Sequence, residues 1–100
     1  MIDIIVSEAC PHCDTQKSIM KEAFYSDEYR IIHVGSSEFE KLEVDLKESV
    51  DAVPYIVVRN EDGQIKHATK GNLEAIKLRR ILNSEMSTFN LSAFRQQAAS

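Results

Sequence analysis

Two cysteines separated by two residues are the clearest sign of chemistry in this sequence. They are its only cysteines and form the tetrapeptide Cys10-Pro11-His12-Cys13. Thiol–disulfide exchange needs a thiolate that attacks and a second thiol close enough to resolve the mixed disulfide. Apolar residues at four-residue spacing predict a helix from about Pro11 to Tyr25, and the start of a helix lowers the pKa of a nearby thiol. We therefore predict Cys10 as the nucleophile and Cys13, one turn further on, as the resolving thiol.

The two residues between the cysteines are expected to tune this chemistry. Proline favours the first turn of a helix, so Pro11 fits the predicted helix start. An imidazole at His12 would offer a positive charge and a hydrogen-bond donor to the thiolate of Cys10. Because this stabilises the dithiol form, it would raise the reduction potential. The alternative is that His12 points into solvent, where an imidazole is mostly neutral near pH 7.

The same cysteine spacing also occurs in half of a four-ligand zinc site. Two more ligands would be needed, and His33 and His67 are the only distant histidines. They fall in different predicted strands and have no ligand-like spacing. We therefore predict no metal at Cys10 and Cys13. Two inert thiols are a further alternative, which the position at a helix start disfavours.

The rest of the sequence predicts alternating strands and helices. The predicted strands are 2–6, 29–34, 55–59 and 64–69, and the predicted helices are 11–25, 37–50 and 73–83. Ser37 and Glu40 form a capping-box pattern for the second helix. Gly71 breaks the fourth strand, and Asn72 offers an N-cap to the third helix. The order β-α-β-α-β-β-α predicts an α/β domain over residues 1–83, with a mixed four-stranded sheet flanked by helices.

Composition excludes several classes of function. The chain has 100 residues, of which 43% are hydrophobic and 28% charged, as in an ordinary globular domain. The net charge of -4 comes with no run of Lys or Arg, so we expect no nucleic acid partner. No segment is apolar enough to span a bilayer, and we expect no membrane association. Residues 84–100 are rich in Ser, Asn, Gln and Ala and are expected to be a C-terminal extension, weakly ordered or a short helix.

The N-terminus and the cysteine usage favour a reducing compartment. Asp3 interrupts the apolar run at residues 2–6, unlike the apolar region of a secretory signal. A disulfide between two cysteines this close together cannot cross-link distant parts of a small secreted domain. We therefore expect a cytoplasmic protein, although a mature form that has lost an export signal would have the same sequence features. We also expect a monomer.

These elements together resemble the thioredoxin/glutaredoxin superfamily in its minimal, glutaredoxin-like form. The resemblance covers residues 1–83 and rests on Cys10-Pro11-His12-Cys13 after a strand, Val53-Pro54 before a hairpin, and Gly71-Asn72 before the last helix. It implies a dithiol–disulfide oxidoreductase. In that superfamily the proline that matches Pro54 is cis and faces the redox pair, and the residue that matches Val53 pairs its backbone with the substrate. An ordinary trans proline at the first residue of a strand is the alternative.

The resemblance also implies partners. The substrates would be protein disulfides, with ribonucleotide reductase as a client by family analogy only. The implied substrate-binding residues are Val53, Pro54, Gly71 and Asn72. No bound cofactor is implied, and the electrons would come from glutathione or from a flavin-dependent thioredoxin reductase.

Two segments differ from the glutaredoxin pattern. Ser7-Glu8-Ala9 stands where many glutaredoxins carry a basic residue, and Lys70-Gly71-Asn72 stands in place of Gly-Gly-x-Asp. Glu8 would repel a carboxylate of glutathione, whereas Lys70 and the helix start after Gly71 would attract one. The sequence therefore leaves the electron donor open.

Other classes of function also stay open. A thioredoxin-like scaffold can serve as a non-catalytic binding module, or can hold an iron–sulfur cluster between two chains through Cys10. Visible absorbance and dimerisation that depends on Cys10 would favour the cluster. A metal-binding structural domain would instead lose its fold on chelation.

Overall fold

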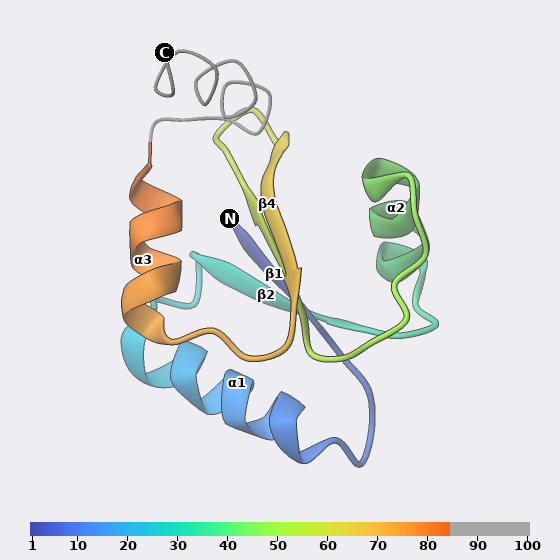
Figure 1. Cartoon of the computed structure of the whole chain (residues 1–100), viewed down its shortest axis with the longest axis horizontal. Helices are drawn as coiled ribbons and strands as arrows, with labels where there is room; N and C mark the ends of the chain where they lie inside the picture. Colours follow the sequence, from blue (N-terminus) through green and yellow to red (C-terminus); the bar gives the residue numbers. More distant parts are fainter. Residues whose placement is uncertain (85–100) are drawn as a thin grey trace, which may run out of the picture.

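A computed structural model describes residues 1–84 of the chain. Strands and helices alternate along these residues in the predicted order (Figure 1). The elements are β1 (Ile2–Val6), α1 (Pro11–Ala23), β2 (Tyr29–His33), α2 (Ser37–Leu46), β3 (Tyr55–Arg59), β4 (Ile65–Lys70) and α3 (Ala75–Asn83). The four strands form one mixed sheet, which confirms the α/β fold class. The predicted C-terminal extension lies, beyond Ser84, outside the described residues.

The sheet has the strand order β2-β1-β3-β4. β1 pairs with β2 in parallel and with β3 antiparallel, and β3 pairs with β4 antiparallel. In this register Ile5 lies opposite Tyr55, and Tyr55 lies opposite Lys70. The end of β1, the start of β3 and the end of β4 therefore meet at one end of the sheet. We call it the motif end, because the chain passes directly from there into the cysteine motif.

Helices cover both faces of the sheet, with α1 and α3 on one side and α2 on the other (Figure 1). Side chains alternate between the faces along each strand, so each face has its own core. The α1/α3 face buries Ile2, Ile4, Val6, Cys13, Met20, Phe24, Ile56, Val58 and Leu78. The α2 face buries Ile5, Ile32, Phe39, Leu42, Tyr55 and Val57. Each of the larger apolar side chains stabilises the fold by about 1.5–3 kcal/mol through its burial.

One charged side chain interrupts the apolar β1 strand. Asp3 is fully buried, and its carboxylate accepts from Arg30 Nε at 2.7 Å and from Arg59 Nε at 3.1 Å. Arg59 also binds the carboxylate of Asp45 at 3.0 Å. A buried charge is tolerated when it is paired and hydrogen-bonded. The network therefore accounts for an acid in a buried strand and ties α2 to the sheet.

The start of α2 differs from the prediction. The N-cap is Ser36, whose Oγ accepts from the amide of Phe39 at 3.1 Å. Ser37 is already the first helical residue, so the predicted capping box of Ser37 with Glu40 is wrong. Ser36 has the extended backbone that an N-cap needs, with φ at -80° and ψ at 165°. Two serines in tandem carry the same capping chemistry, and the backbone decides between them.

The end of α2 also comes earlier than predicted. Lys47 adopts the left-handed conformation, with φ at 61°, and ends the helix after Leu46. Val50 therefore lies in the following loop, although it still packs against the α2-face core. Its backbone amide donates to Glu43 Oε2 at 2.8 Å. The apolar spacing therefore predicts correctly that Val50 packs against the core, but wrongly that it is helical.

The predicted N-cap of the last helix is wrong as well. α3 begins at Ala75, its N-cap is Glu74, and no side chain caps it. Asn72 lies before this helix start and uses its side chain elsewhere, as described below. The other end of α3 is held by Lys66, whose Nζ donates to the carbonyls of Leu82 and Ser84. Within residues 1–84, no helix has both the length and the apolar character needed to cross a membrane.

Candidate redox site

Cys10 occupies the N-cap position of α1. Ala9 before it has a left-handed backbone, with φ at 52°, and turns the chain from β1 into the helix. The Sγ of Cys10 accepts a hydrogen bond from the amide of Cys13 at 3.2 Å. Sulfur thus fills the place that a Ser, Thr or Asp oxygen usually takes at a helix start. This location at the helix start confirms the position predicted for Cys10.

The two cysteines have different environments. Their Cα atoms are 5.2 Å apart, and their sulfurs are joined in a disulfide. Cys13 is fully buried in the α1/α3-face core, whereas Cys10 is partly exposed at the rim of that core. A sulfur that approaches from solvent therefore reaches Cys10 and not Cys13. This asymmetry is what the predicted roles of nucleophile and resolving thiol require.

Pro11 and His12 are both exposed on the first turn of α1. Pro11 is the first helical residue, where its missing amide hydrogen leaves no bond unmade. The backbone carbonyl of His12 accepts from Asn72 Nδ2 at 2.8 Å. The imidazole of His12 belongs to an exposed residue, so its influence on the thiol of Cys10 stays a prediction.

The Val53–Pro54 bond is cis, as the resemblance implied. Pro54 is buried directly before β3, and its carbonyl accepts from the amide of Gly71 at 2.8 Å. Gly71 has φ at +92°, a conformation that side chains with a Cβ rarely adopt. Val53 is half-buried and packs against both cores. The structure therefore joins two of the predicted substrate-binding segments directly.

Gln16, which is not among the predicted site residues, completes the connection. Its fully buried side chain lies one turn after Cys13. Gln16 Oε1 accepts from Asn72 Nδ2 at 3.1 Å and from the amide of Leu73 at 2.9 Å. Its Nε2 donates to the carbonyl of Leu73 at 3.1 Å. A sequence signal did exist, since Gln16 follows Cys13 on the core-facing side of the helix, where a polar residue requires a hydrogen-bond partner.

These bonds explain why Asn72 is not an N-cap. Its side-chain amide reaches back to α1 and donates to both the carbonyl of His12 and the side chain of Gln16. The predicted site residues thus form a connected unit. The cysteine motif meets Asn72 through His12, and Gly71 meets Pro54.

The same arrangement of elements occurs in a known structure. The solution structure of an uncharacterized thioredoxin-like protein from Clostridium perfringens matches this chain with a TM-score of 0.60 and 20% sequence identity. The match covers 82% of this chain and 67% of that chain. This chain has a thioredoxin-like fold. The comparison with protein-family models gives no match, and neither does the comparison with curated proteins.

The thioredoxin-like fold and its Cys-x-x-Cys pair together favour a thiol–disulfide redox role in broad terms. The zinc alternative would need His33 and His67 as its two further ligands. His33 and His67 lie on β2 and β4, the opposite edge strands of the sheet. Within residues 1–84, no group of three or more His, Cys, Asp and Glu side chains is arranged to hold a metal ion.

Proposed function

We propose that this chain is a dithiol–disulfide oxidoreductase that reduces protein disulfides in the cytoplasm. The observation that carries the proposal is the placement of Cys10, partly exposed at the N-cap of α1 with Cys13 buried behind it. An amide already donates to the sulfur of Cys10, and the dipole of the helix favours negative charge there. Both effects stabilise a thiolate at Cys10 once the pair is reduced.

The reaction begins with the reduced pair. The thiolate of Cys10 attacks one sulfur of the substrate disulfide, forms a mixed disulfide and releases the other substrate sulfur as a thiolate that takes up a proton. Cys13 then loses its proton and attacks the sulfur of Cys10. This step forms the Cys10–Cys13 disulfide and releases the second substrate thiol. The substrate gains two electrons and two protons, and the cysteine pair loses them.

Two loop segments support the substrate in this proposal. Val53–Pro54 and Gly71–Asn72 border the cysteine motif, and the hydrogen bonds of His12 with Asn72 and of Gly71 with Pro54 hold them there. The backbone of Val53 would pair with an extended segment of the substrate, as in strand addition to a sheet edge. Aligned in this way, a substrate disulfide would lie next to Cys10.

The oxidised pair must be reduced again after each cycle. Either glutathione or a flavin-dependent thioredoxin reductase would supply the two electrons. Glu8 is exposed two residues before Cys10 and would repel the carboxylates of glutathione, whereas Lys70, exposed directly before Gly71, would attract them. The two charges oppose each other, so the experiment includes both donors.

The test is reduction of a protein disulfide such as that of insulin, followed through NADPH oxidation. One reaction contains glutathione and glutathione reductase, and a parallel one contains thioredoxin reductase. Turnover with either system supports the proposal and identifies the donor. Absence of turnover with both, while the Cys10→Ser/Cys13→Ser protein gives the same background, would contradict it.

A further inference from the structure

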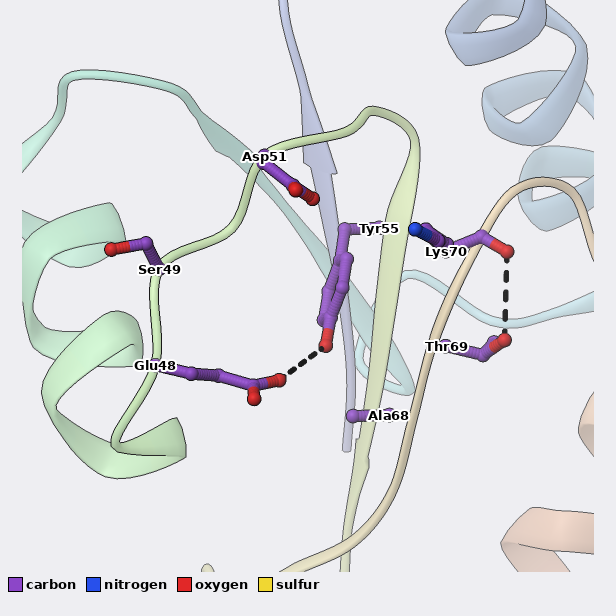
Figure 2. Close-up of a pocket in the computed structure, with 7 residues that line it drawn as sticks. All are labelled: Glu48, Ser49, Asp51, Tyr55, Ala68, Thr69 and Lys70. Atoms are coloured by element: carbon purple, nitrogen blue, oxygen red, sulfur yellow. Dashed lines mark hydrogen bonds between the residues drawn. The ribbon is translucent and has the colours of Figure 1, made fainter.

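We call the predicted substrate-binding segments, Val53–Pro54 and Gly71–Asn72, the substrate platform. A cavity of about 390 Å³ opens beside it. It is lined by Glu48, Ser49, Asp51, Tyr55, Ala68, Thr69 and Lys70 (Figure 2). Its volume lies within the range of ligand pockets, roughly 300–1,000 Å³. None of its residues belongs to the cysteine motif or to the predicted substrate-binding set. The cavity is therefore distinct from the cysteine motif and from the predicted substrate-binding residues.

The position of the cavity ties it to the redox site. Tyr55 directly follows Pro54, and Lys70 directly precedes Gly71. Tyr55 and Lys70 are cross-strand partners at the motif end of the sheet. Tyr55 belongs to the α2-face core, so the cavity lies on the α2 face. A substrate segment paired with Val53 would pass beside Pro54 and so beside this cavity.

The inner wall of the cavity is acidic. Tyr55 is buried, and its hydroxyl donates a hydrogen bond to Glu48 Oε1 at 3.3 Å. The pKa of Tyr55 is raised above its ordinary value by burial, by the charge of Glu48 and its hydrogen bond, and by the charge of Asp51. Each of these charges disfavours a second negative charge on the ring oxygen. The carboxylates of Glu48 and Asp51 thus place negative charge beside Tyr55 in the wall of the cavity, which suits a cation.

The hydrogen-bonding capacity of the acids is only partly used. Glu48 Oε1 accepts from Tyr55, and Asp51 makes no side-chain hydrogen bond or ion pair within residues 1–84. Lys70 makes no side-chain bond there either, and Figure 2 shows it on the opposite side of the Tyr55 ring from Glu48 and Asp51. Two carboxylates thus outnumber one ammonium group and keep a surplus of negative charge.

We propose that this cavity selects a basic side chain, Lys or Arg, close to the reacting cysteine of a protein disulfide substrate. The proposal rests on the proposed function and adds a substrate preference to it. An extended chain advances about 3.3 Å per residue, so side chains two to four residues from the reacting cysteine lie about 7–13 Å from it along the substrate. The cation of one such side chain would meet Glu48 and Asp51, while its methylene groups would pack along the ring of Tyr55.

The experiment compares three disulfide-bonded peptides that differ only in the residues two to four positions from one cysteine. These residues are Lys in the first peptide, Ala in the second and Glu in the third. We expect kcat/KM to fall in the order Lys, Ala, Glu, with about two- to fivefold per carboxylate engaged. The preference should shrink at high salt, because exposed charges are screened.

Matched variants test the origin of the preference. The Glu48→Gln/Asp51→Asn protein keeps the shape of the wall and an acceptor for Tyr55, and should reduce the Lys and Glu peptides at similar rates. Removal of the same two charges elsewhere, with Glu40→Gln/Asp62→Asn, should leave the preference intact. Lys70→Gln removes the opposing ammonium group and should increase the preference for Lys.

The outcomes separate this inference from the proposed function. Reduction of all three peptides at equal rates, or a preference for the Glu peptide, would overturn the assignment and leave the oxidoreductase proposal standing. A preference for Lys that survives Glu48→Gln/Asp51→Asn would also overturn it. Failure to reduce any peptide, together with failure on protein disulfides, would contradict the proposed function itself.

Discussion

Gln16 and Leu73 exchange two hydrogen bonds across 57 positions of the chain. The amide of Leu73 donates to the side-chain oxygen of Gln16 at 2.9 Å, and its carbonyl accepts from the side-chain nitrogen at 3.1 Å. The Gln16 side chain thereby pairs with the main chain of Leu73 as a neighbouring strand would. Through Asn72 and Gly71, the same loop reaches the motif and Pro54. Gln16 therefore sets the distance between the helix that carries the cysteines and the segments that we propose for substrate binding.

Gln16→Ala should weaken both the fold and substrate binding. It leaves the main-chain groups of Leu73 without their partners, so unfolding by urea should require about 1–3 kcal/mol less free energy. A displaced loop should raise KM for a protein disulfide more than it lowers kcat. Ser18→Ala, an exposed change on the same helix, should alter neither quantity.

The conservative variant Gln16→Glu separates positioning from stability alone. Its carboxylate still accepts from Asn72 and Leu73 but cannot donate to the carbonyl of Leu73, so KM should be partly restored. The reduction potential of the cysteine pair should stay at the wild-type value in Gln16→Ala, which adds no charge beside Cys13. A fall in kcat with unchanged KM would argue that Gln16 does not position the substrate platform.

The two cysteines should respond differently to serine. Cys10→Ser should abolish turnover, although the serine hydroxyl can still cap α1 through the amide of Cys13. Cys13→Ser should accumulate mixed disulfides with the substrate, because the resolving step is lost. Mass spectrometry after incubation with substrate measures the trapped species. Full activity of Cys13→Ser toward glutathione mixed disulfides would replace the dithiol mechanism with a monothiol one.

The buried charge on β1 should matter for stability and not for catalysis. Asp3→Asn removes the charge that pairs with Arg30 and Arg59, and should lower the free energy of unfolding by about 1.5–3 kcal/mol. Asp45→Asn removes only an exposed partner of Arg59 and should lower it by less than about 1 kcal/mol. Chemical denaturation measures both. Equal losses of stability in Asp3→Asn and Asp45→Asn would mean that burial does not strengthen the interactions of Asp3. A loss of turnover in folded Asp3→Asn would contradict a purely structural role.

Glu28 should make stability depend on pH in the acidic range. Its pKa lies below the ordinary value of 4.5, chiefly because Arg79 donates to its carboxylate and then because the amide of Tyr25 does. Between the folded-state pKa of Glu28 and its ordinary value of 4.5, the unfolded chain binds more protons than the folded chain. The stabilisation by Glu28 is therefore present above pH 4.5 and is lost as the pH falls through the folded-state pKa. Glu28→Gln should flatten the dependence of unfolding free energy on pH below about pH 5. Glu22→Gln, an exposed change on α1, should leave that slope unchanged.

The sequence was sufficient for the fold because its signals are local and agree with one another. β-branched runs such as Tyr55–Arg59 predicted strands with the observed bounds. The two-residue cysteine spacing at the start of a helical pattern located the N-terminal end of α1. The resemblance added the cis bond before Pro54, which neither spacing nor composition could have indicated.

What the sequence did not reveal depends on contacts between distant residues. Gln16 and Asn72 find each other only after the sheet has brought α1 and the loop after β4 together. The same holds for Asp3, whose partners come from β2 and β3. The N-cap of α2 was not predicted for another reason. Ser36 and Ser37 carry the same side chain, and only the extended backbone at Ser36 makes it the N-cap. The cavity beside Tyr55 combines a loop and two strands, so no single sequence window predicts it.

The strand order described above also bears on how copies of this chain behave at high concentration. Within residues 1–84, β2 and β4 lie at the two edges of the sheet, and the backbone groups of an edge strand invite strand addition from another molecule. Arg30 is exposed on β2, and Lys70 is exposed on β4. Basic side chains on an edge strand would repel the same strand of a second copy and discourage edge-to-edge aggregation. The open edges of this small sheet are thus protected by charge, and substitution of these residues by apolar ones would favour fibrous assembly.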